Sequence, residues 1–178
     1  YYTAHAEIDS KINVPIMASA LRKGSFELCG AEADVAFTYV CPGNYIHDVA
    51  LPSMKRGAEE AGRPTPPIIA SVVVCLNDKV EEVRETIKQE LGFYTTLPDY
   101  VQMFTDAGFP ESSNGQWSDR MVDSIVCSGS ETDISNKLNE MFEFGASELW
   151  VHMVGSGSNK EMSLKSTRQF IGEYSKSI

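Results

Sequence analysis

The residues best placed to do chemistry form a short turn near the start of the chain, Ala18-Ser19-Ala20-Leu21-Arg22. The turn follows an apolar run and opens a predicted helix, so free backbone N–H groups and the positive end of the helix dipole are expected there. Ser19 can donate a hydroxyl hydrogen bond, and Arg22 or Lys23 can pair with anionic oxygens. The turn is therefore a candidate phosphate site. The alternative is an ordinary strand–helix turn with a serine cap and solvated cations.

Other side chains with possible chemistry are isolated in the sequence. Thr38 and Tyr39 end a predicted strand, where an inward side chain could face a ring system, although packing is the interpretation we favour. His152 lies on a strand of alternating bulky residues, and a lone histidine there is more typical of a packed residue than of a base. Neither a glycine-rich nucleotide loop nor a nucleophile elbow occurs. The sequence thus identifies no catalytic residue and no metal site.

Composition limits the possible partners. The net charge of −10 argues against binding to nucleic acid or to anionic lipid, because both need clustered cations. No apolar run reaches the roughly 20 residues that cross a bilayer. Four cysteines without a CxxC pair favour reduced thiols in a cytoplasmic protein over structural zinc. The length predicts a single domain over residues 1–178, with residues 1–12 irregular.

The elements that must position these residues alternate along the chain. Continuous apolar runs typical of buried strands occur at residues 14–18, 33–40, 68–76 and 148–154. Helical patterns separate the runs, and several consecutive helices follow the third one. Strands that alternate with helices predict right-handed crossovers and a parallel sheet. Ligands of such sheets bind at the carboxyl ends of the strands, which is where Ser19 and Tyr39 lie.

Four strands make an incomplete sheet, because both outer strands would leave backbone groups unpaired. One natural completion is an open doubly wound sheet, which usually has five or six strands. The other is a (β/α)₈ barrel of about 250 residues, of which this chain would form half. The strand pattern alone leaves both completions open.

The amino-acid sequences of several segments, taken in order, resemble the luciferase-like monooxygenase family, the superfamily of bacterial luciferase. The first is Pro15-Ile16-Met17-Ala18-Ser19-Ala20-Leu21 with the later Gly30-Ala31-Glu32-Ala33-Asp34, which is similar to the strand–helix unit of that family's fifth strand. The family usually has Gly-Pro where this chain has Leu21-Arg22. The other matching segments are Cys41-Pro42-Gly43-Asn44-Tyr45, Leu51-Pro52-Ser53-Met54-Lys55-Arg56-Gly57-Ala58, Ala61-Gly62-Arg63 with Pro67, Leu91-Gly92-Phe93-Tyr94, Leu97-Pro98-Asp99-Tyr100, Ala107-Gly108-Phe109-Pro110 and Trp117-Ser118-Asp119.

This resemblance implies an α/β fold of the (β/α)₈ TIM-barrel type, here its C-terminal half with about four parallel strands and a helical insertion after the third. It implies an oxidoreductase or monooxygenase that uses FMN or a deazaflavin coenzyme on a small-molecule substrate. Ala18, Ser19, Ala20, Leu21 and Arg22 would hold the cofactor phosphate, and most catalytic side chains would lie on strands outside this chain. The alternative is a truncated, catalytically inactive half-barrel that binds flavin or pairs with a second copy as a homodimer.

Overall fold

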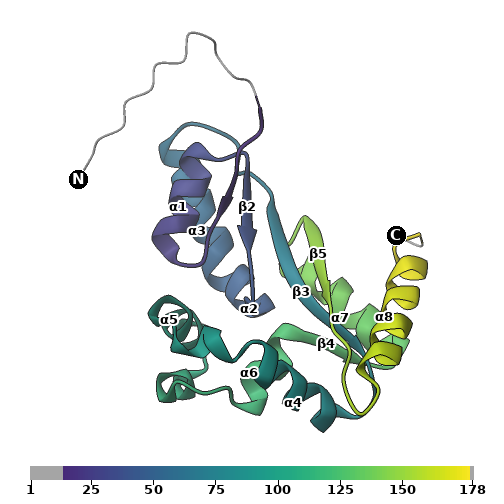
Figure 1. Ribbon diagram of the computed structural model, residues 1–178. Helices are drawn as coiled ribbons and strands as arrows, with labels where there is room; N and C mark the ends of the chain where they lie inside the picture. Colours follow the sequence, from purple (N-terminus) through teal and green to yellow (C-terminus); the bar gives the residue numbers. More distant parts are fainter. Residues whose placement is uncertain (1–13, 177–178) are drawn as a thin grey trace, which may run out of the picture.

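A parallel sheet of five strands runs through residues 14–176, the part of the chain that the computed structural model describes (Figure 1). The expectation that residues 1–12 are irregular lies outside the described residues. The strands are β1 (Met17–Ser19), β2 (Val35–Thr38), β3 (Ile68–Leu76), β4 (Val126–Gly129) and β5 (Glu148–Met153).

The long strand β3 organises the sheet, because it pairs with three other strands. On one edge it pairs first with β2, through residues 68–70, and then with β4, through residues 73–76. Its other edge pairs with β5, and β1 extends the sheet beyond β2. The sequence predicts four strands, so β4 is an addition. It has only four residues and continues directly from a helix, which left no separate apolar run to indicate it.

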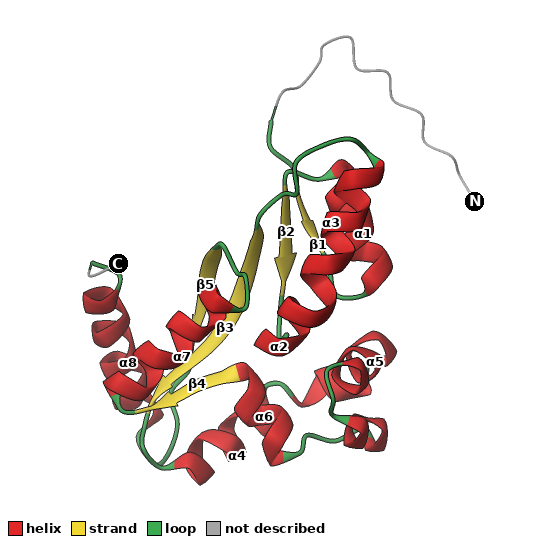
Figure 2. Ribbon diagram, turned by 180° about the vertical axis from the view of Figure 1, so that it is seen from behind, coloured by secondary structure: helices red, strands yellow, loops and turns green. Residues whose placement is uncertain are grey.

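Helices follow the strands and pack against the sheet. In Figure 2, α1 and α3 lie beside β1 and β2, α7 and α8 lie beside β3 and β5, and the helices between β3 and β4 gather near the carboxyl ends of the strands. The helices are α1 (Lys23–Glu32), α2 (Gly43–Tyr45), η1 (Ile46–Ala50), α3 (Leu51–Glu60), α4 (Val80–Glu90), η2 (Gly92–Thr96), α5 (Pro98–Asp106), η3 (Pro110–Asn114), α6 (Asp119–Ile125), α7 (Glu131–Glu143) and α8 (Lys160–Tyr174).

Two glycines allow α1 and α3 to approach each other very closely. A Cβ at Gly30 would overlap the backbone oxygen of Met54, and a Cβ at Gly57 would overlap the backbone oxygen of Glu27. The absence of these side chains lets the two helix backbones meet directly. Because α1 opens at the Ser19 turn, this contact also fixes where that turn lies.

The sheet is covered on the helix side and partly open on the other side. Most of β3 is buried, which agrees with its continuous apolar sequence. By contrast, Met17 and Trp150 are 59% and 57% exposed although both are large and apolar and lie on strands. Within residues 14–176, no helix is long and apolar enough to cross a bilayer.

Candidate functional site

The open side of the sheet presents an aromatic and apolar surface, which we call the open face. Phe37 of β2 and Trp150 of β5 meet edge to face with their ring centroids 5.2 Å apart. Around them lies a hollow of about 350 Å³, a size that suits part of a small ligand. The residues that line this hollow are Met17, Phe37, Ile69, Glu148, Leu149 and Trp150.

A polar pair lies on the same side of the sheet, toward the carboxyl ends of the strands. Tyr39 directly follows β2, and its hydroxyl lies 3.0 Å from Nδ1 of His152 on β5. The two rings are stacked, with centroids 6.3 Å apart. The Tyr39 ring also lies near Trp150, at 6.5 Å. The structure therefore joins Tyr39 and His152, which the sequence left as separate packing residues 113 positions apart.

Aromatic residues of the helical insertion continue this surface. Tyr94 lies 5.5 Å from the Tyr39 ring and 4.8 Å from the Tyr100 ring, centroid to centroid. Burial raises the pKa of Tyr39, and the nearby Tyr94 adds to the increase. Burial likewise raises the pKa of Tyr100. Tyr39 and Tyr100 consequently keep their protons and act as neutral hydrogen-bonding groups.

The turn that follows β1 lies next to the open face. Met17 and Ser19 alternate along β1 and so point to the same side of the sheet, and Ser19 is in register with Phe37. Ser19 is exposed, Ala20 is buried, and Ala18 is partly covered. The structure thus brings the predicted phosphate turn to the edge of the aromatic surface.

The backbone of this turn is tied down more tightly than the sequence suggested. The N–H of Ala20 donates to the carbonyl of Phe37 at 2.8 Å. The N–H groups of Leu21 and Arg22 both donate to Oγ of Ser25, at 3.1 and 3.0 Å, and that hydroxyl donates to the Arg22 carbonyl. The N–H groups free to meet an anion are therefore those of the first turn of α1, which begins at Lys23.

Arg22 connects the turn to the helical insertion. Its guanidinium lies 3.8 Å from the carboxylate of Asp99 and 3.7 Å from that of Asp106, both on α5. Burial raises the pKa of Tyr45 to about 12, an effect that the nearby Arg22 charge partly offsets. The two carboxylates neutralise part of the positive charge that Arg22 would present to a ligand. Lys23, which is exposed, has the more accessible charge.

The backbone is strained where β2 leaves the sheet. Val40 has a φ of +52°, a region that β-branched residues rarely occupy. Such strain is often found at functional sites.

β2 pairs with β3 only as far as Ala70, and β4 begins to pair at Val73. Ser71 and Val72 therefore have no partner strand on that edge of β3.

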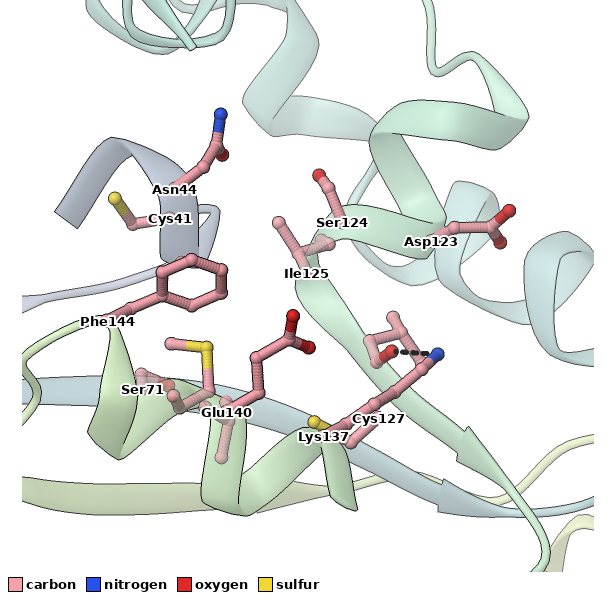
Figure 3. A pocket seen from close by; sticks show the side chains of 14 residues that line it. Cys41, Asn44, Ser71, Asp123, Ser124, Ile125, Cys127, Lys137, Glu140 and Phe144 are labelled. Carbon is pink, nitrogen blue, oxygen red and sulfur yellow. Dashed lines mark hydrogen bonds between the residues drawn. The ribbon is translucent and has the colours of Figure 1, made fainter. Parts of the chain in front are cut away.

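A second cavity, of about 200 Å³, occupies this gap between β2 and β4 (Figure 3). Phe144, Ile125 and Glu140 point toward its centre, whereas Asp123 points away. Lys137 reaches back to donate to the carbonyl of Val126 at 3.3 Å. The hydroxyl of Ser71, which also lines the cavity, is buried without a hydrogen-bond partner among the described residues. This cavity could not be predicted from the sequence, because its walls come from four separate segments.

The four cysteines, Cys29, Cys41, Cys75 and Cys127, are free and buried, and burial raises the pKa of each thiol, to about 12 for Cys41 and Cys127. Thiolates are the reactive form, so we expect the native thiols to react with a disulfide reagent at least ~100-fold more slowly than in denaturant. Release of the reagent chromophore measures this rate. A thiol that reacts equally fast in the native protein would contradict the burial described above.

No three histidine, cysteine, aspartate or glutamate side chains within residues 14–176 come together in a way that could hold a metal ion. The donors around the open face are hydroxyls, an imidazole, backbone N–H groups and cations. Such a set suits a phosphorylated, aromatic organic ligand.

Comparison with known proteins agrees with this description of the fold. The sequence matches the luciferase-like monooxygenase family over residues 2–148, and the chain belongs to that family. The match confirms the resemblance noted in the sequence. A search of curated proteins gave no match.

Solved structures of enzymes share the fold at low sequence identity. An F420-dependent secondary alcohol dehydrogenase in complex with an F420-acetone adduct has a TM-score of 0.62 and 14% identity, over 80% of this chain and 44% of its own. Coenzyme F420 dependent tetrahydromethanopterin reductase from Methanopyrus kandleri has a TM-score of 0.62 and 17% identity, over 90% and 49%. The oxygenating constituent of 3,6-diketocamphane monooxygenase from Pseudomonas putida, in complex with FMN, has a TM-score of 0.54 and 16% identity, over 87% and 45%.

The chain thus spans about half the length of these solved structures. Together with the parallel sheet, this confirms the predicted α/β class and the half of a (β/α)₈-type barrel.

Proposed function

We propose that this chain is the C-terminal part of a flavin- or deazaflavin-dependent oxidoreductase and that it provides the binding site for the cofactor phosphate. The observation that carries the proposal is the position of Ser19, which lies in register with Phe37 at the edge of the open face. A phosphate held at the turn would leave an attached ring system beside the aromatic surface. The F420 and FMN named for the similar structures are ligands of this kind.

The donors at the turn fit a phosphate group. The hydroxyl of Ser19 and the ammonium of Lys23 are exposed, and the first turn of α1 offers backbone N–H groups. Gly24 has no atom within 4 Å of the position that a Cβ would take, so an anion can approach the backbone there. Ser25 positions these donors by holding the N–H groups of Leu21 and Arg22.

The residues of the open face would orient the ring system. Phe37 and Trp150 provide flat apolar contacts, and Tyr94 covers the side toward the insertion. When bound, such a cofactor supplies hydride transfer or oxygen activation, while the protein binds it, orients it and limits access of water. We further infer a small-molecule substrate and, from the free buried thiols, a cytoplasmic location.

Titration of the purified chain with FMN, the deazaflavin coenzyme and riboflavin tests the proposal. Because riboflavin lacks the phosphate, we expect it to bind at least ~10-fold more weakly than FMN. Arg22→Ala should weaken FMN binding about 3- to 10-fold and leave riboflavin unaffected, whereas Arg168→Ala, at an exposed position on α8, should change neither. If the folded chain binds none of the three compounds, the proposal is wrong.

A second candidate function is a half-barrel that pairs with another copy of itself. The exposed apolar side chains Met17 and Trp150 favour it, because pairing would remove them from water. Size-exclusion chromatography with light scattering measures the molar mass of the chain in solution and, together with the flavin titration, distinguishes the two functions. A stable dimer that binds no flavin supports the pairing module, whereas flavin binding with a measurable phosphate preference supports the oxidoreductase.

A further inference from the structure

His152 carries an accessible ring nitrogen at the open face. Its Nδ1 lies 3.0 Å from the Tyr39 hydroxyl. Its Nε2 has no hydrogen-bond partner among the described residues, and this atom is not fully buried. One side of the imidazole is therefore fixed by the protein, and the other is available to a ligand.

The direction of the hydrogen bond between the Tyr39 hydroxyl and Nδ1 decides which ring nitrogen of His152 carries the proton. Burial raises the pKa of the Tyr39 hydroxyl, so this group remains protonated and has a hydrogen to donate. If the hydroxyl donates to Nδ1, that nitrogen accepts, and the hydrogen of the neutral ring must be on Nε2. The planes of the two rings are inclined by 26° and their centroids lie 6.3 Å apart.

We propose that Tyr39 holds His152 as the Nε2–H tautomer and that this N–H donates a hydrogen bond to an acceptor edge of the ring system bound at the open face. This inference rests on the proposed function, because it deepens the account of the same site. Tyr39 is then a positioning residue, and His152 contacts the ligand.

The chemistry of the ligand follows from the donor and its surroundings. A neutral N–H donor prefers a carbonyl oxygen or an unprotonated ring nitrogen. The aromatic side chains Phe37, Tyr39 and Trp150 favour a flat partner. The carbonyl and ring-nitrogen edge of a flavin or deazaflavin combines both properties. A donor at that edge also favours the electron-rich, reduced form of the ring.

The tautomer can be measured directly in the whole chain labelled with ¹⁵N. Long-range proton–nitrogen correlations at about pH 8, where free imidazole is neutral, identify the protonated nitrogen. His47 provides an internal reference, because its Nδ1 lies 2.7 Å from a carboxylate oxygen of Asp48 and must donate to it. We expect the Nε2–H form for His152 and the Nδ1–H form for His47. The variants His47→Gln and His152→Gln assign the signals.

Tyr39→Phe removes the hydroxyl while keeping the ring. We expect the His152 signals to move toward a mixture of tautomers in this variant, with His47 unchanged. An Nδ1–H form of His152 in the unaltered protein, or signals that do not respond to Tyr39→Phe, would overturn the proposal. Far-ultraviolet circular dichroism shows whether the variant is folded. If Tyr39→Phe is not folded, the tautomer of His152 in the unaltered protein alone tests the proposal.

Addition of FMN tests contact with the ligand. We expect FMN to shift the Nε2 signal of His152, His152→Ala to weaken FMN binding about 3- to 10-fold, and His152→Gln, which retains an N–H donor, to recover much of the loss. If FMN shifts the backbone N–H signals of Lys23 and Gly24 but not those of His152, this inference fails while the proposed function stands. If FMN shifts no signals, both fail.

Discussion

In Ser19→Asp, we expect FMN affinity to fall at least ~100-fold while the free energy of unfolding stays within about 0.5 kcal/mol of that of the unaltered chain. Ser19 is exposed, so the change removes no packing. The new carboxylate would face the phosphate, and like charges a few ångströms apart repel by several kcal/mol near a protein surface. Fluorescence titration measures the affinity, and urea denaturation measures the stability.

Two comparisons isolate the charge. Ser19→Asn has nearly the same shape without a charge, and we expect it to weaken FMN binding less than ~10-fold. Riboflavin has no phosphate, so its affinity should be the same in both variants. If Ser19→Asp binds FMN as well as the unaltered chain does, the phosphate lies elsewhere and the proposed role of the turn is wrong.

Gly57→Ala should lower the free energy of unfolding by about 3 kcal/mol. The added Cβ would overlap the backbone of Glu27, which cannot rotate out of the way as a side chain could. The helices α1 and α3 would have to separate, and their shared buried side chains would lose contact. For a domain of this size, the melting temperature should fall by roughly 6 to 12 °C, as measured by calorimetry.

Gly172→Ala is the matched control for this change. Gly172 lies within α8 at an exposed position, with no atom within 4 Å of the place of a Cβ. Alanine is a better helix former than glycine, so we expect this variant to gain about 0.5 to 1 kcal/mol. A similar loss in both variants would show that the close helix contact is not the reason for the effect at Gly57.

The parts of the fold that could be predicted from the sequence are those whose pattern is local. β3 spans residues 68–76 as its continuous apolar run predicted. β4 was missed because its four residues are too few to show a period. The order of strands in the sheet was also not predictable, because pairing depends on contacts between segments far apart in the chain.

The candidate site shows the same division. The Ser19 turn could be found because a strand, a small polar residue and a basic helix start lie side by side in the sequence. The pair of Tyr39 and His152 could not, since it spans 113 positions and three strands. Nor did any local signal indicate that Ser25 would take up the N–H groups of Leu21 and Arg22.

Because β3 pairs with three other strands, unfolding of the sheet depends on this strand more than on any other. Segments from both ends of the described chain attach to β3, which lies between them in sequence. In the sheet, β2 and β5 are connected to each other only through their hydrogen bonds to β3. Local opening at an outer strand can leave the remaining sheet intact, whereas release of β3 divides it into disconnected pieces. We therefore expect the strand-paired amide hydrogens of β3 to exchange with solvent only on global unfolding, which hydrogen-exchange measurements can test.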